Sequence, residues 1–234
     1  CIKIVGIYGK FILFSPQFFI IRLKISLLFP PAWHPSQSYL SLPSLTGFLT
    51  QGGVTTLSQL DLGIELLDKV VTHSYGVTLY QELVDKQRML EQERTGDTGP
   101  GSAEHLARVV ESLDRFPYLI DRIEPAKETL RGEGFYDLES YKESLFLIDK
   151  WLEVLSTLYF PTRLTVVDNQ FGSCSIYSSK DLMKILRAES QQPSIPLFYE
   201  QFVPSIVADH PVLIGFSITA PYTFFPCITP VPLL

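Results

Sequence analysis

Two apolar stretches far apart in the chain decide the expected fold: Ile25-Ser26-Leu27-Leu28-Phe29-Pro30-Pro31-Ala32-Trp33 and Pro211-Val212-Leu213-Ile214-Gly215-Phe216-Ser217-Ile218-Thr219-Ala220-Pro221. Each is a short apolar run that ends in proline and small residues, which is typical of a strand buried on both faces of a parallel sheet. Ligands of open parallel sheets bind beyond the carboxyl ends of the strands. We therefore expect the functional site at residues 30–38 and 219–222.

The residues between these stretches predict an α/β fold. Residues 43–51 have the apolar spacing of a short helix, and residues 54–62 read as a second strand, so strand, helix and strand form a βαβ unit. From residue 63 to about residue 160 the pattern is helical. We expect this block to be an insertion packed beside the sheet, because it is too long for a simple crossover.

Local signals place the ends of several helices in and after this insertion. Ser102 and Asp137 are expected to cap two of them, and Ser178 with Asp181 has the spacing of a capping box. Residues 196–208 predict one more helix before the last strand. The expected organisation is an N-terminal extension (1–22), the first βαβ unit (23–62), a mainly helical insertion (63–208), and a third core strand with a truncated tail (209–234).

Composition narrows the class of protein. A hydrophobic content of 46% with 19% charged residues describes a globular chain, and a net charge of −6 argues against a general nucleic-acid binder. The three cysteines lie too far apart for a CxxC metal site, and their odd number argues against a disulfide framework. A cytoplasmic location is therefore expected.

Both ends of the sequence raise separate questions. Residues 11–21 are apolar, but Pro16 and Gln17 interrupt the run and Arg22 ends it, so we expect an extension rather than a membrane span. The chain begins with Cys1 and has three prolines among its last nine residues, where a crossover helix is expected. We interpret the chain as a fragment, or as a gene product with displaced ends.

Common catalytic motifs are missing from the sequence. It has no HExxH or GxSxG, no Walker loop and no GxGxxG. Cys174 has no neighbouring base and is interpreted as a structural thiol. No catalytic or metal-ligating residue is therefore assigned.

The loop after the first strand is the strongest candidate for binding. Pro30 and Pro31 fix its backbone, and Trp33 offers a large flat apolar surface. Small polar and aromatic residues add hydrogen-bonding groups at the same edge: Ser36, Gln37, Ser38 and Tyr39. Such a loop suits the edge of a large, mostly neutral cofactor. The alternative is that Trp33 only covers the top of the sheet, and the residues themselves leave both interpretations open.

Three parts of the sequence resemble the N-terminal region of cobalamin-dependent radical S-adenosylmethionine (SAM) enzymes. The first is Leu27-Leu28-Phe29-Pro30-Pro31-Ala32-Trp33, continued by Pro35-x-x-x-Tyr39-Leu40-x-Leu42-Pro43-x-Leu45-Thr46-x-Phe48-Leu49. The second is Gly53-Val54 with Leu60-Asp61-Leu62-Gly63-Ile64-Glu65, and the third is Ile214-Gly215-Phe216-Ser217-Ile218-Thr219-Ala220-Pro221. Their order and placement between residues 24 and 225 carry the resemblance.

The resemblance implies a flavodoxin-like (Rossmann-like) cobalamin-binding domain in front of a radical SAM barrel. In that family the barrel holds an iron–sulfur cluster on CxxxCxxC, and many members use methylcobalamin for methyl transfer or related radical chemistry. The residues that would border the cobalamin are, by position, Pro30, Pro31, Trp33, Ser36, Gln37 and Tyr39, with Thr219 and Pro221 on the neighbouring strand.

The chain also departs from that family. It contains no CxxxCxxC and no DxHxxG, so the cluster and SAM are expected only in a missing C-terminal barrel, and no axial cobalt ligand is assigned. About three of five sheet strands are expected here, which makes the fold a partial flavodoxin-like sheet. We expect no catalysis from this chain alone.

Two other interpretations stay open. The chain could be a non-enzymatic α/β interaction module that pairs with a partner through an exposed sheet edge. The third interpretation is a membrane-associated protein anchored through residues 11–21.

Overall fold

The computed structural model describes residues 24–30, 39–93, 100–165, 169–172, 174–175, 177–187 and 200–218. Its elements in chain order are β1 (Lys24–Phe29), α1 (Ser41–Gln51), β2 (Thr56–Asp61), α2 (Leu62–Val70), α3 (His73–Glu93), α4 (Pro100–Arg131), the 3-10 helix η1 (Glu133–Tyr136), α5 (Leu138–Thr157), β3 (Thr162–Leu164), β4 (Asn169–Phe171), α6 (Ser179–Arg187), α7 (Glu200–Ala208) and β5 (Leu213–Phe216). None of the helices in these ranges combines the length and hydropathy that crossing a bilayer requires.

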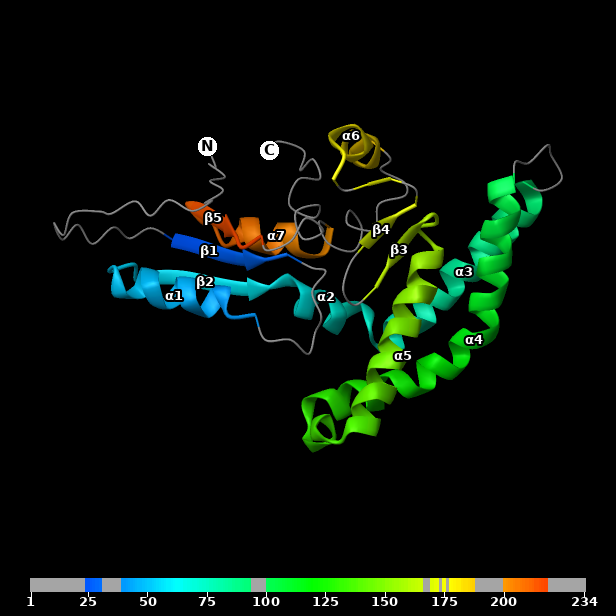
Figure 1. The fold of residues 1–234 in the computed structure, drawn as a ribbon, viewed down its shortest axis with the longest axis horizontal. Coiled ribbons are helices and arrows are strands. Elements are labelled where there is room, and N and C mark those ends of the chain that lie inside the picture. The colour runs from blue at the N-terminus through cyan, green and yellow to red at the C-terminus, as the bar shows by residue number, and fades with distance from the viewer. Residues whose placement is uncertain are drawn as a thin grey trace.

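A parallel sheet of three strands, in the order β2-β1-β5, joins the two ends of the described chain (Figure 1). Ile25 in the middle strand lies opposite Leu57 of β2 and opposite Leu213 of β5. The two apolar stretches that predict the fold are therefore neighbouring strands. This confirms the expected α/β class.

Helices cover both faces of this sheet. Leu42 of α1 packs with Ile25, Leu27 and Phe29 of β1 on one face. On the other face, Leu28 of β1 packs with the first residue of α2 and with Phe202 of α7. Because alternate side chains of a strand point to opposite faces, β1 is buried on both, as predicted. The residues of β5 are only half-buried, since β5 lies at the edge of the described sheet.

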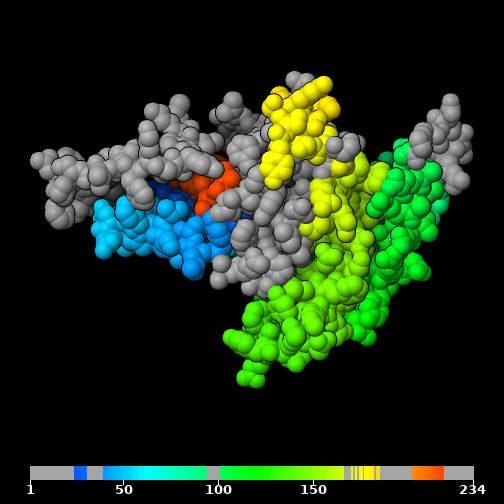
Figure 2. All heavy atoms as spheres, in the orientation of Figure 1, coloured from blue at the N-terminus to red at the C-terminus, as the bar shows by residue number. Residues whose placement is uncertain are grey.

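The helices α3, α4 and α5 pack into a bundle, which is called the helical unit below. Its core contains Trp151 and Phe116, both 0% exposed, whose ring centroids lie 4.8 Å apart. The indole Nε1 of Trp151 donates a hydrogen bond to the carbonyl oxygen of Val70 at the end of α2, at 2.8 Å. Leu66 of α2 packs against this core and also against the sheet. The helical unit lies on the side toward which the arrows of β1 and β2 point (Figure 1), and Figure 2 shows its green atoms apart from the blue atoms of α1.

The helix starts agree with the sequence signals in some places and not in others. Asp137 caps α5 as predicted, because its carboxylate accepts a hydrogen bond from the backbone N–H of Ser140 at 2.9 Å. Ser102 is not a cap: α4 begins at Pro100, and proline fits the first turn of a helix, where its missing N–H costs nothing. Ser178 accepts a hydrogen bond from the N–H of Asp181, but the carboxylate of Asp181 binds the N–H of Ser175 instead of closing the box.

Two further differences concern element boundaries. The strands β3 and β4 form a small antiparallel pair inside the block expected to be mainly helical. Helix α1 begins two residues before the predicted Pro43, and α7 is described from Glu200 onward. The division into an extension, a βαβ unit, an insertion and a tail stays a prediction.

Candidate functional site at the carboxyl edge of the sheet

The topology brings the carboxyl ends of three strands to one edge of the sheet. Pro30 follows β1 directly, Asp61 is the last residue of β2, and Ser217 follows β5. The strand β2 pairs with one side of β1, and β5, the next strand of this sheet along the chain, pairs with the other side. Such a reversal leaves a crevice between the two crossovers, at the carboxyl ends of the strands, where open α/β sheets bind ligands. Here that point lies between β1 and β5.

Three hydroxyl groups meet at this point. Ser217 Oγ donates a hydrogen bond to Ser41 Oγ at 2.7 Å, and Tyr39 Oη lies 3.5 Å from Ser217 Oγ. The backbone N–H of Ser217 donates to the carbonyl oxygen of Leu28 at 2.9 Å, which ties the end of β5 to β1. The ends of two strands and the start of α1 therefore share one polar cluster.

Tyr39 also contributes an aromatic surface to the edge. Its ring stacks on the ring of Phe29, with centroids 4.0 Å apart and an interplanar angle of 25°. Phe29 is buried, whereas Tyr39 and Ser217 are half-buried. The edge thus combines a flat apolar surface with hydroxyl donors and acceptors, a mixture found in ligand sites.

The starts of the two helices at this edge differ. At α1 the N-cap residue Leu40 has no side-chain acceptor, and no acidic residue lies in the first turn. At α2 the carboxylate of Asp61 accepts hydrogen bonds from the N–H groups of Gly63 at 3.0 Å and Ile64 at 3.2 Å. Burial raises the pKa of the Asp61 carboxyl, and these two hydrogen bonds lower it. Asp61 is therefore occupied as a helix cap, whereas the start of α1 has no side-chain cap.

Two of the predicted site residues fall within the described structure. Pro30 is buried at the end of β1, and Tyr39 lies at the point where β1, β5 and α1 meet. The others lie outside the described residues: Pro31, Trp33, Ser36, Gln37, Thr219 and Pro221.

Ser41 and Ser217 are not among the site residues predicted from the sequence. Their contact spans 176 positions in the chain, so only the pairing of β1 with β5 reveals it. One signal was visible in Ser217 itself, because it is a polar residue within an otherwise apolar run, at the place where the strand ends. The predicted site began two residues later.

Two hollows on the described surface lie at helices α4 and α5, away from this edge of the sheet. One hollow of about 430 Å³ lies at the end of α4, and one of about 290 Å³ lies between α4 and α5. Neither borders the sheet. Among the described residues, no three His, Cys, Asp or Glu side chains gather closely enough to hold a metal ion.

No protein-family model matches this chain, and no curated protein or solved structure does. The likeness to cobalamin-dependent radical SAM enzymes therefore rests on the residues quoted above. It stays a prediction.

Proposed function

We propose that this chain is the cobalamin-binding, N-terminal part of a radical SAM enzyme. One observation carries the proposal: the first and third of the resembling segments form neighbouring parallel strands, β1 and β5, and their carboxyl ends meet at one site. These segments lie near opposite ends of the sequence. If these segments did not pair, the residues that carry the resemblance would not lie at one site.

The strand order supports the same proposal. The order β2-β1-β5 is the beginning of the 2-1-3-4-5 order of flavodoxin-like domains, with β5 as the third strand of the sheet. In that topology the ligand lies beyond the carboxyl ends of the first and third strands. On this proposal the sheet is a partial flavodoxin-like fold, with the helical unit inserted between its second and third strands.

The described residues at this edge fit one side of cobalamin. The corrin rim carries neutral amide groups, and the hydroxyls of Ser41, Ser217 and Tyr39 can both donate to and accept from them. Pro30 holds the start of the loop without offering an N–H. The remaining predicted contacts would come from residues 31–37 and 219–221. When bound, cobalamin supplies methyl-transfer chemistry.

The chemistry itself would take place in another part of the full-length protein. The iron–sulfur cluster and SAM need a CxxxCxxC motif, which these 234 residues lack. We place both in a C-terminal barrel that packs against this chain, and the whole enzyme in the cytoplasm. This chain alone is proposed to bind without catalysing a reaction.

Equilibrium dialysis of the full chain against hydroxocobalamin, followed by its visible absorbance, tests the proposal. We expect retention of the cofactor, and a loss of affinity of about threefold to tenfold in Ser217→Ala and in Tyr39→Phe, because each variant removes one hydrogen bond. Tyr177→Phe is the matched control, since Tyr177 is 81% exposed and lies outside the sheet. Absence of retention, or an equal loss in the control, would overturn the proposal.

The outer strands of the described sheet favour a second candidate function, a module that pairs with a partner strand. No strand among the described residues pairs with the outer edge of β2 or of β5. Thr56 in β2 is exposed, and Val212 beside β5 is 57% exposed. Edge pairing predicts an assembly in sedimentation velocity that Thr56→Lys dissociates. A monomer at every concentration would rule out pairing between copies of this chain.

A further inference from the structure

The exposed residues of α1 and β2, called the uncharged surface below, carry no charge. Residues 25–60 contain no Asp, Glu, Lys or Arg, although 19% of the whole chain is charged. Several residues of this run are exposed in the folded chain: Pro43, Thr50, Thr56 and Gln59. Depletion of charged residues is the compositional signal of the buried core of protein interfaces.

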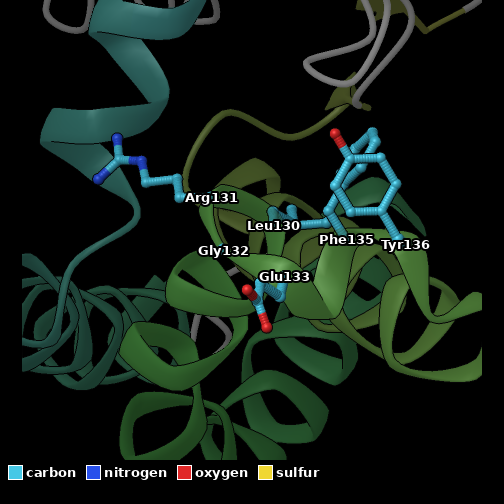
Figure 3. A pocket seen from close by; sticks show the side chains of 6 residues that line it. All are labelled: Leu130, Arg131, Gly132, Glu133, Phe135 and Tyr136. Carbon is cyan, nitrogen blue, oxygen red and sulfur yellow. The ribbon is translucent and has the colours of Figure 1, made fainter.

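Other parts of the described surface do carry charge. In the helical unit, Arg108 and Glu104 form an exposed ion pair on α4. The hollow at the end of α4 is lined by residues of both signs, and Figure 3 shows Arg131 and Glu133 there. The lack of charge is therefore a local property of the uncharged surface.

The strand β2 has no protection against pairing at its outer edge. No strand among the described residues pairs with that edge. Natural sheets that keep an edge unpaired usually place proline or charged residues, especially lysine, on it. Residues 56–60 contain neither. The sequence of β2 therefore suits pairing with a further strand.

Helix α1 runs beside this strand, and the middle of the helix lies level with the middle of β2. Thr46 Oγ1 donates a hydrogen bond to Gln59 Oε1 at 3.0 Å. Pro43 and Thr50 lie on the same side of α1 as Thr46, because residues three and four positions apart share a face of a helix. Figure 1 shows α1 and β2 together on the side of the sheet away from β5. One neighbouring molecule can therefore contact the helix and the strand at once.

The absence of charge favours a second copy of the chain as this neighbour. Each copy has a net charge of −6, so two copies repel each other wherever their acidic surfaces meet. At the uncharged surface no like charges face each other. A basic or an acidic partner would find no opposite charge there, and burying its own charge without a partner is costly.

Two-fold symmetry combines the helix and the strand in one contact. Most homodimers have a two-fold axis, about which a patch of one copy meets the same patch of the other. An axis perpendicular to the sheet, beside Gln59, places two β2 strands antiparallel and two α1 helices side by side on the same face. A single axis serves both contacts because Thr46 and Gln59 lie at one level.

We propose that α1 and the outer edge of β2 form the interface of a two-fold homodimer, in which Gln59 of one copy lies beside Gln59 of the other. This inference rests on the second candidate function, edge pairing, and specifies the strand and the partner. It leaves the carboxyl edge of the sheet and the outer edge of β5 open, so it does not depend on cobalamin.

Sedimentation velocity of the full chain, with opposite charges introduced at one position, tests the dimer. We expect the unmodified chain to dimerise, and Gln59→Lys and Gln59→Glu each to associate about fivefold more weakly, because like charges opposite each other destabilise a strand pair. An equimolar mixture of the two variants should associate at least as strongly as the unmodified chain, since Lys then faces Glu. The matched control is Gln81→Lys, at an exposed glutamine of α3, and it should change nothing.

The outcomes distinguish the two-fold dimer from edge pairing in general. A monomer at every concentration, or an assembly that neither Gln59 variant weakens, would overturn the dimer. If Thr56→Lys dissociates the assembly but the mixture of Gln59 variants does not associate again, edge pairing stands and the two-fold contact is wrong. Association of the mixture also shows that each variant is folded, and cobalamin retention is measured separately by dialysis.

Discussion

The sheet and the helical unit differ in how far apart in the sequence their contacting elements lie. In the helical unit, α3, α4 and α5 follow one another in the chain and pack against their neighbours around Trp151. In the sheet, β1 pairs on one side with β5, which lies near the other end of the chain. The helical unit is therefore specified by local sequence, whereas the candidate ligand site depends on a distant contact. Structures built on local contacts also form faster than those that must first close a long loop.

The largest expected effects come from removing the central side chain of each core. Trp151→Ala should destabilise the helical unit by about 3–5 kcal/mol, and Leu28→Ala should destabilise the sheet by about 2–5 kcal/mol. Native-state hydrogen exchange then separates the two regions. We expect Trp151→Ala to speed exchange mainly in residues 73–157, and Leu28→Ala to speed it mainly in β1, β2 and β5. Equal acceleration throughout the chain in both variants would show that the sheet and the helical unit unfold as one cooperative unit.

One glycine in each region should respond to substitution by alanine, with effects of opposite sign on stability. A Cβ at Gly76 in α3 would lie 2.5 Å from Cη2 of Trp151 and 2.9 Å from Cγ1 of Ile120, so Gly76→Ala should destabilise the chain by about 1–3 kcal/mol. A Cβ at Gly47 in α1 would meet nothing within 4 Å. Because glycine weakens a helix, Gly47→Ala should stabilise it by about 0.5–1 kcal/mol. Urea denaturation curves give both values, and a stabilising Gly76→Ala would contradict the packing around Trp151.

The smallest expected effect is a dependence of the helical unit on pH, through His105. This side chain is 8% exposed, its Nε2 lies 2.7 Å from the carbonyl oxygen of Thr157, and its ring stacks on Phe160. Burial lowers its pKa from the ordinary value of 6.5; the hydrogen bond to Thr157 raises the pKa, and among the charged neighbours Lys86 and Arg108 lower it while Glu93 raises it. The folded state thus binds the proton less readily than the unfolded state.

The sign of the pH effect follows from this difference. Above the unfolded pKa the neutral ring is stable in both states, and as the pH falls below about 6.5 the unfolded state takes up the proton first, so stability is lost. Thermal unfolding followed by circular dichroism should show a lower midpoint at pH 5.5 than at pH 7.5, by less than the shift caused by Gly76→Ala. In His105→Gln that difference should shrink, and an unchanged difference would assign it to other groups.

More of the helical unit than of the candidate ligand site could be predicted from the sequence. The apolar periodicity and caps of the helical unit are local, so the helices around Asp137 and Trp151 could be predicted from a few neighbouring residues. The strands β1 and β5 were predictable because each is a continuous apolar run. The pair β3 and β4 was not, since three-residue strands contain too little pattern. The contact of Ser41 with Ser217 could not be predicted for a different reason: it exists only after distant strands have paired.

Helix α2 connects the sheet to the helical unit, and no loop residue separates it from β2. Asp61 is both the last residue of β2 and the N-cap of α2, and Val70, at the other end of the helix, accepts the hydrogen bond from Trp151. These nine residues span about 14 Å, and Leu66 between them touches both cores. A displacement of the helical unit that keeps these contacts would therefore also displace Asp61, at the carboxyl edge of the sheet.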